Sequence, residues 1–122
     1  MRIQRAEKYG FCAGVRIADR KVKKFASLGG DDGKILGQVV HNERVVDEME
    51  ALGVSTIESL EEIDEGTVVF SAHGVPPSFH SEAQSRGLKI LDTTCPFVYD
   101  IHEEADRAVA DGAHLVFIGE SE

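Results

Sequence analysis

The chain has 122 residues, enough for one domain with a hydrophobic core, and its 42% hydrophobic and 29% charged residues are typical of a water-soluble protein. The net charge of −9 argues against a general nucleic-acid or anionic-membrane surface, because both need a basic patch, but a small anionic ligand is still compatible. No apolar run approaches the roughly 18 residues of a membrane span, and no signal sequence is recognisable, so we expect a cytoplasmic location with reduced cysteines.

The hydrophobic pattern predicts strands that alternate with helices along the whole chain. Most of these strands are short apolar runs between Gly-containing or acidic turns. In chain order the predicted strands are residues 2–9, 34–40, 54–57, 67–72, 88–92 and 113–119. The alternation predicts an α/β fold with a mainly parallel sheet.

The predicted helices are recognised by apolar residues at helical spacing and by capping residues at their starts. The first helix follows Cys12 and carries arginines and lysines opposite its apolar side. Asn42 is a suitable N-cap for the second helix, and the proline pair in "HGVPPS" favours the start of a third. Thr94 is the expected cap of the fourth helix, which runs from Pro96 to about Ala110.

The chain also contains an internal repeat. In both units a predicted strand leads to a cysteine, a helix, a Gly-containing turn and a second strand. Cys12 lies about 25 positions before Gly37, and Cys95 lies about 24 positions before Gly119. The shared position of the cysteine favours a true repeat over a chance likeness of two βαβ segments.

This repeat predicts the domain organisation. The first unit continues through two more helices and a strand, whereas the second unit reaches only its second strand. We therefore expect a first α/β lobe over residues 1–92 and the beginning of a second, similar lobe over residues 93–122, with the chain cut off inside it.

Two cysteines and two histidines directly follow predicted strands. Cys12 and Cys95 stand before predicted helices, and His41 and His73 lie in "VVHN" and "SAHG". Ligands of open α/β sheets bind at the carboxyl ends of parallel strands. These four side chains are therefore predicted to share one edge of the sheet.

The two cysteines leave two interpretations open. At a helix N-terminus the positive end of the helix dipole favours thiolate, which is the form that binds iron–sulfur clusters and zinc. A pair of buried, inert thiols would show the same spacing. Two cysteines cannot complete a four-thiolate cluster site, so any cluster needs further ligands.

The two histidines are candidates for binding phosphate. An imidazole at a strand end can donate to a phosphate oxygen, and the neighbouring helix N-terminus adds backbone N–H groups. Gly74 permits close approach of the backbone beside His73, and Ser71 in the same turn is a weaker candidate. A capping or core histidine is the alternative for either residue alone. The histidines interpreted as surface or packing residues are His80, His102 and His114.

Four motifs in order, "GFCAGV", "VVHNERVV", "SAHGVPP" and "DTTCPFV", resemble the 4-hydroxy-3-methylbut-2-enyl diphosphate reductase family, iron–sulfur enzymes that end the non-mevalonate isoprenoid pathway. The resemblance covers essentially the whole chain. It implies a fold of three similar α/β lobes around a [4Fe–4S] cluster, with one cysteine from each lobe. By this resemblance Cys12 and Cys95 are cluster ligands, and His41 and His73 bind the diphosphate of the substrate.

The resemblance also implies a reaction and its partners. An iron without a protein ligand takes the substrate hydroxyl, and two one-electron reductions with proton delivery expel water, which gives isopentenyl and dimethylallyl diphosphate. A ferredoxin or a flavodoxin would supply the electrons. The family's third cysteine and its proton-delivering His-x-Glu segment would lie after Glu122. We therefore assign no catalytic residue here, and we expect this chain alone to be inactive and to self-associate through the apolar segment 115–118.

Other classes of protein fit some of these residues. A non-enzymatic metal-binding module could hold zinc with Cys12, Cys95, His41 and His73, although structural zinc sites usually have ligand pairs close in sequence. A plain phosphate- or nucleotide-binding α/β domain is a further alternative, but the chain has no GxGxxG or P-loop motif. The cysteines form no CxxC pair, which argues against a dithiol oxidoreductase.

Overall fold

A single parallel sheet organises the fold. The computed structural model describes residues 1–7, 9–30 and 32–118. Its strands follow the order β2-β1-β3-β4, and each neighbouring pair is parallel. The strands are β1 (Gly33–Leu36), β2 (Ser55–Ile57), β3 (Thr67–Phe70) and β4 (Lys89–Asp92). The predicted α/β fold with a mainly parallel sheet is confirmed.

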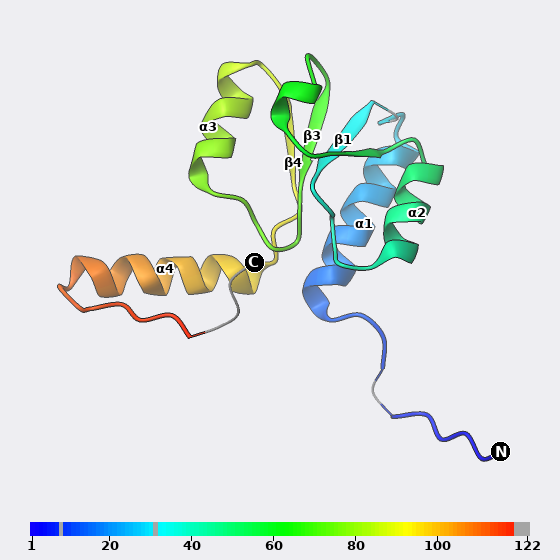
Figure 1. Ribbon diagram of the computed structural model, residues 1–122, viewed down its shortest axis with the longest axis horizontal. Coiled ribbons are helices and arrows are strands. Elements are labelled where there is room, and N and C mark those ends of the chain that lie inside the picture. The colour runs from blue at the N-terminus through cyan, green and yellow to red at the C-terminus, as the bar shows by residue number, and fades with distance from the viewer. Residues whose placement is uncertain (8, 31, 119–122) are drawn as a thin grey trace.

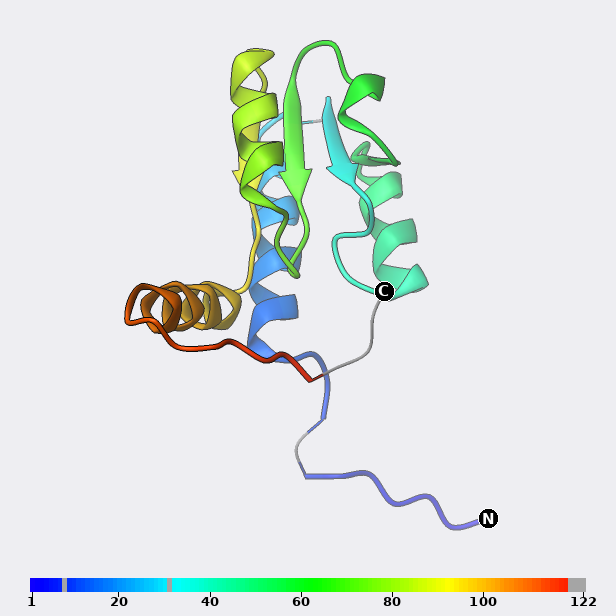
Figure 2. The same cartoon turned by 60° about the vertical axis from the view of Figure 1, so that its left-hand side comes forward.

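Helices alternate with these strands and cover both faces of the sheet. They are α1 (Ala13–Ser27), α2 (Glu43–Ala51), the 3₁₀-helix η1 (Leu60–Glu62), α3 (Pro77–Ser85) and α4 (Pro96–Ala110). Helices α1 and α2 lie on one face, α3 lies on the other, and α4 extends sideways from the end of β4 (Figures 1 and 2). In the described part of the chain, none of the helices combines the length and apolar surface that crossing a bilayer requires.

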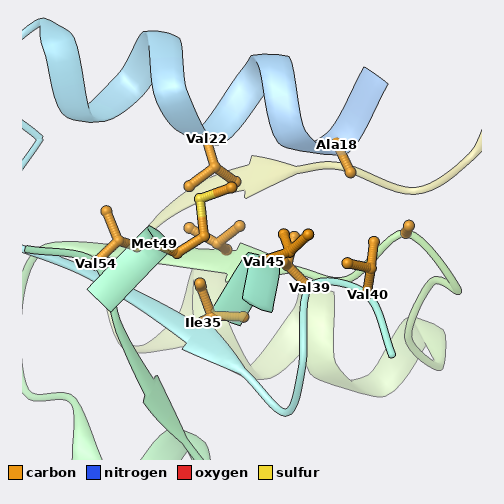
Figure 3. Packing of buried hydrophobic residues seen from close by; sticks show 10 residues of the cluster. Ala18, Val22, Ile35, Val39, Val40, Val45, Met49 and Val54 are labelled. Atoms are coloured by element: carbon orange, nitrogen blue, oxygen red, sulfur yellow. The ribbon is translucent and has the colours of Figure 1, made fainter. Parts of the chain in front are cut away.

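Two clusters of buried side chains hold the layers together. On the first face, Val22 of α1 and Met49 of α2 pack over Ile35 of β1 (Figure 3). On the second face, Phe70 of β3 is fully buried in a cluster that includes Ala83 of α3. Each large side chain buried in this way stabilises the fold by about 1.5–3 kcal/mol relative to an exposed one. The sheet is therefore a firm base for the loops at its edge.

Two predicted strands are not formed. Residues 2–7 have no strand structure, and Ile3, the expected anchor, is 81% exposed. Residues 113–118 also form no strand, and they run back along α4 (Figure 1). A strand needs a neighbour for its backbone hydrogen bonds, and neither segment pairs with the four-stranded sheet. The predicted strands also included Lys8 and Gly119, which lie outside the described residues, and Tyr9, which is not in a strand.

The cysteine-containing repeat is recovered in its helices and in one flanking strand of each unit, β1 after α1 and β4 before Cys95. Helices α1 and α4 have 15 residues each, and a cysteine is the N-cap of both. No strand precedes Cys12 in the described ranges, and none follows α4 up to residue 118. The described residues of the two units therefore share the cysteine cap and the length of the helix, and each unit lacks one of its two predicted strands.

Several boundaries differ from the prediction, and two of them have clear local reasons. The strand predicted over 34–40 ends at Leu36, because Gly37 turns the chain with a positive φ of 67°. The cap of α4 is Cys95 rather than Thr94, whose N–H instead donates to Asp92 at 2.8 Å. The predicted start of α2 is confirmed, since the Asn42 side chain accepts the Val45 N–H at 3.3 Å.

Candidate functional site

The loops that follow β1, β3 and β4 are joined by backbone hydrogen bonds. The Ala72 N–H donates to the Val39 carbonyl at 3.0 Å, and the Cys95 N–H donates to the Ala72 carbonyl at 3.0 Å. These bonds continue the lateral order of the sheet beyond the ends of its strands. They hold the loops that carry His41, His73 and Cys95 along one edge, the edge at which open parallel sheets bind ligands.

The two histidines that follow β1 and β3 lie side by side. The ring centroids of His41 and His73 are 4.6 Å apart, and the ring planes are inclined by 42°. Both residues are exposed. They line a pocket with a volume of about 220 Å³, and the other residues of this concave surface are Phe11, Val15, Val40 and Asn42. A ligand can therefore reach both imidazoles from the same side.

The two cysteines occupy equivalent places at the starts of α1 and α4. The Cys12 sulfur accepts the Val15 N–H at 3.5 Å, whereas Cys95 makes no side-chain capping bond. Both are free thiols, with Cys12 exposed and Cys95 half-buried. Each sulfur therefore lies at the positive end of a 15-residue helix.

Gly14 allows the first turn of α1 to lie directly against Cys95. A Cβ atom at Gly14 would be 2.6 Å from the Cys95 sulfur and 2.9 Å from the Cys95 Cβ. Contacts this short do not occur between real side chains, so only glycine permits this approach. Because Gly14 is two residues after Cys12, the contact brings both cysteines to the same edge of the sheet.

The turn before Cys95 is fixed by polar contacts that the sequence interpretation did not include. Asp92 accepts the Thr94 N–H and the Tyr99 hydroxyl, and its carbonyl accepts the Lys21 ammonium at 2.7 Å. Burial by itself would raise the pKa of Asp92, but the hydrogen bonds from Thr94 and Tyr99 outweigh it and lower the pKa. The bond to Asp92, followed by burial, raises the pKa of Tyr99. An Asp two residues before a Thr is the sequence signal of such a turn.

The sequence interpretation also missed two residues at this edge. Asn42 was predicted only as a helix cap, yet it lines the same concave surface as His41. His102 was interpreted as a surface or packing residue, yet it lines a second concave surface, of about 370 Å³, together with His73. His102 comes seven residues after Cys95, about two helical turns, and that spacing was the available signal.

The four predicted residues do not form a closed metal site by themselves. Within residues 1–7, 9–30 and 32–118, no three His, Cys, Asp or Glu side chains are grouped closely enough to hold a metal ion. A structural zinc site requires four such ligands in tetrahedral geometry.

The fold and this edge define a parallel α/β protein that presents two histidines and Cys95 after the carboxyl ends of its strands, with Cys12 at the start of α1 beside them. The chain belongs to the family described as LytB protein, whose model matches residues 3–122. The resemblance carried by the four sequence motifs is thereby confirmed.

Two similar proteins from different bacteria carry the same name. The chain is 45% identical over 120 residues to 4-hydroxy-3-methylbut-2-enyl diphosphate reductase of Tolumonas auensis, which covers 98% of this chain and 39% of that protein. It is 43% identical over 119 residues to the protein of the same name from Acidothermus cellulolyticus, covering 97% of this chain and 35% of that protein. The chain thus spans less than two-fifths of the length of these curated relatives.

Solved structures lead to the same group of proteins. The fold matches the structure of a protein described as E-1-hydroxy-2-methyl-but-2-enyl-4-diphosphate reductase from Plasmodium falciparum. The TM-score is 0.80 at 28% identity, over 86% of this chain and 33% of that one. A second match is a structure described as (E)-4-hydroxy-3-methyl-but-2-enyl diphosphate reductase, the terminal enzyme of the non-mevalonate pathway. Its TM-score is 0.80 at 36% identity, over 94% of this chain and 41% of that one.

Proposed function

We propose that this chain forms part of an iron–sulfur reductase that converts 4-hydroxy-3-methylbut-2-enyl diphosphate to isopentenyl and dimethylallyl diphosphate. The relatives of that name, at 43% and 45% identity over almost the whole chain, support the proposal. The observation that carries it is the pairing of His41 with His73, whose centroids are 4.6 Å apart, at the edge that also holds Cys95.

Cys12 and Cys95 suit two ligand positions of a [4Fe–4S] cluster. Their sulfurs lie at two helix N-termini, and Gly14, which has no Cβ atom, lets the start of α1 lie against the Cys95 side chain. When bound, the cluster would supply electrons and an iron that acts as a Lewis acid on the substrate hydroxyl. The chain has two cysteines, so the three-cysteine ligation implied for the family needs a third from elsewhere. We therefore expect no turnover by these 122 residues alone.

His41 and His73 would hold the diphosphate. Each imidazole can donate an N–H to a phosphate oxygen. Because the two rings are close together, they can donate hydrogen bonds to neighbouring oxygens of one diphosphate. The N-terminus of α2, which Asn42 caps, adds backbone N–H groups and the positive end of a helix dipole. A substrate anchored there would leave its hydroxyl end free to extend toward the cysteines of the same edge.

The reaction consumes two electrons and two protons for each substrate. One C–O bond breaks, the hydroxyl leaves as water after protonation, and one C–H bond forms. A protein that carries single electrons, such as a ferredoxin or a flavodoxin, is the proposed donor. A cytoplasmic location is part of the proposal, because the free thiols of Cys12 and Cys95 suit a reducing compartment.

The domain division is also a proposal. Residues 1–92 contain the four strands and the helices that cover them, and α4 buries none of its residues. A helix with no buried side chain in this lobe is expected to pack elsewhere, which supports residues 93–122 as the beginning of a second lobe.

Titration with inorganic pyrophosphate and with the substrate, under anaerobic conditions and by calorimetry, tests the histidine assignment. Replacing His41 or His73 by Ala should weaken binding by about tenfold, the loss expected for one charge-assisted hydrogen bond. His114→Ala is the matched control, since His114 is exposed beyond the end of α4. Equal affinity in all three variants would overturn the assignment.

Reconstitution with iron and sulfide tests the cysteine assignment. A longer relative, such as the Tolumonas auensis protein, is the reference. In it, Cys→Ser changes at the positions equivalent to Cys12 and Cys95 should each lower the amount of bound cluster. In the 122-residue chain itself, the same two changes should remove whatever iron the protein retains. Iron retention that is indifferent to both cysteines would contradict their assignment as ligands.

A further inference from the structure

Positive charge is concentrated in the first fifth of the chain. Residues 1–24 contain eight of the 13 lysines and arginines but only two of the 22 acidic residues, which gives this segment a formal charge of about +6. The remaining residues carry about −15. The net charge of −9 therefore conceals a strongly basic segment in an otherwise acidic protein.

Helix α1 presents this charge to solvent. Ala18 and Val22 are fully buried on its inner side, whereas the arginines and lysines of the outer side are exposed. Part of the outer side is hollowed into a concave surface of about 500 Å³. The residues of this surface, called here the basic face of α1, are Arg16, Asp19, Arg20, Lys23, Lys24 and Ser27.

Most of the charge on the basic face is not neutralised within the protein. Lys23 is paired with Asp19 at 2.8 Å and with Glu48 at 3.1 Å. Among the residues that the structure describes, no carboxylate forms an ion pair with Arg20 or Lys24. These cations are available to an external partner.

The basic face begins one helical turn from Cys12. The Arg16 N–H donates to the Cys12 carbonyl at 3.1 Å, and the Arg16 guanidinium donates to the Phe11 carbonyl at 3.1 Å. Phe11 in turn lines the concave surface that holds His41 and His73. A partner seated on the basic face would therefore lie next to the proposed cluster-binding edge.

We propose that the basic face of α1 is the docking surface for an acidic face of the protein that donates single electrons to this reductase. The proposal rests on the proposed function, which requires an external electron donor. Complementary charge steers two proteins together and fixes their orientation, and it weakens as salt is added. The position of the face beside Cys12 gives the docked donor a short path to the cluster.

The charge distribution favours an acidic protein over a nucleic acid. Helix α1 has 15 residues and is about 22 Å long, so the basic face is a compact patch. A nucleic acid presents regularly spaced charges along an extended backbone and would also meet the remainder of the chain, which is acidic. A protein with a local acidic patch avoids this repulsion.

Binding of an acidic [2Fe–2S] ferredoxin and of an acidic flavodoxin to the 122-residue chain, measured separately by calorimetry at low and high salt, tests the proposal. For the donor that binds, the double variant Arg20→Glu with Lys24→Glu should raise Kd by about tenfold or more, because four units of charge change at the contact. The double variant Lys89→Glu with Arg107→Glu has the same net charge, changes exposed residues outside α1, and should bind as the unsubstituted chain does.

The proposal would be overturned if donor binding weakened equally in both double variants, or if neither donor bound. It would also be overturned if a short single-stranded RNA displaced the donor and bound with equal or higher affinity. Far-UV circular dichroism shows whether each variant keeps its fold. Arg20→Glu with Lys24→Glu should keep its affinity for pyrophosphate, since both residues lie two or more helical turns beyond Cys12. Donor binding and diphosphate binding are thus measured separately. The docking proposal can therefore be overturned while the proposed function stands.

Discussion

The Tyr99 hydroxyl donates a hydrogen bond to the Asp92 carboxylate and so joins the first turn of α4 to the end of β4. The other carboxylate oxygen of Asp92 accepts the Thr94 N–H at 2.8 Å. Because α4 buries none of its residues, polar contacts such as this junction tie the start of the helix to the end of β4. It also holds Cys95, which lies between the two partners in the chain.

Replacing Tyr99 by Phe should loosen α4 while leaving the sheet intact. The change removes one hydrogen bond to a carboxylate, a loss of about 1 kcal/mol at an exposed position. Amide hydrogen exchange should become faster in α4 and stay unchanged in β1 and β3. Tyr9→Phe is the matched control, because the Tyr9 ring lies against Arg5 in the exposed N-terminal segment. Unchanged exchange in α4 would show that the hydroxyl does not hold the helix.

The stability of the same junction should depend on acid pH. Burial by itself would raise the pKa of Asp92, but the bonds from Thr94 and Tyr99 bring its pKa below the ordinary value of 3.8. A carboxyl group with a lowered pKa stabilises the folded state above its ordinary pKa, and this stabilisation is lost as the pH falls through the folded value. Protection of α4 amides should therefore decline below about pH 3.8.

Asp92→Asn should flatten that acid dependence, because the amide keeps an acceptor oxygen but does not titrate. The matched control is Asp106→Asn, on the exposed surface of α4, which should keep the profile of the unsubstituted chain. If the two variants give the same profile, another acidic group governs the junction.

Much of the fold follows from signals that are local in the sequence. Asn42 before an apolar helical pattern and Pro77 at the start of α3 predicted their helices correctly, because capping and the fixed φ of proline act within one turn. The segments 2–9 and 113–119 look like strands by the same local criteria. Whether they form strands depends on a neighbour in the sheet, which no local pattern contains.

The candidate site divides in the same way. The common edge of His41 and His73 could be predicted, because parallel strands place their carboxyl ends together. The contact of Gly14 with Cys95 could not, since it depends on how α1 packs against a loop 81 residues later in the chain. The role of Asp92 was missed for a related reason, because one of its partners, Tyr99, is brought to it by the direction of α4.

Gly14→Ala should destabilise the protein although alanine is the better helix former. Helix propensity alone would favour alanine by about 1 kcal/mol. The new Cβ would lie 2.6 Å from the Cys95 sulfur, and overpacking of this kind costs about 1–3 kcal/mol. Urea unfolding should therefore show a lower or at best unchanged free energy of unfolding.

The reference for this substitution is the Cys95→Gly background, in which neither the sulfur nor the Cys95 Cβ is present. There Gly14→Ala should become stabilising, because only the helix propensity remains. Stabilisation by Gly14→Ala in the unsubstituted chain would mean that α1 and the Cys95 loop are not in close contact.

Two changes at Asn42 should separate helix capping from ligand binding. Asn42→Ala removes the acceptor for the Val45 N–H and should lower the free energy of unfolding by about 1 kcal/mol. Asn42→Asp keeps the acceptor, so stability should be retained, but its negative charge beside His41 should weaken pyrophosphate binding. Calorimetric titration and urea unfolding of both variants check this. Equal pyrophosphate affinity in Asn42→Asp would place the diphosphate away from this surface.

The apolar side of α4 should make the chain associate with itself. Ile101 is 56% exposed and Phe117 is 73% exposed, and with Leu115 they line an apolar concave surface of about 460 Å³. Apolar area in contact with water favours association, so light scattering should show dimers or larger species at high protein concentration. Ile101→Asp should shift the population toward monomer. Gln84→Asp, which adds the same charge at an exposed position of α3, should not. A monomer that persists at high concentration, or an equal effect of the two variants, would mean that this surface does not drive association.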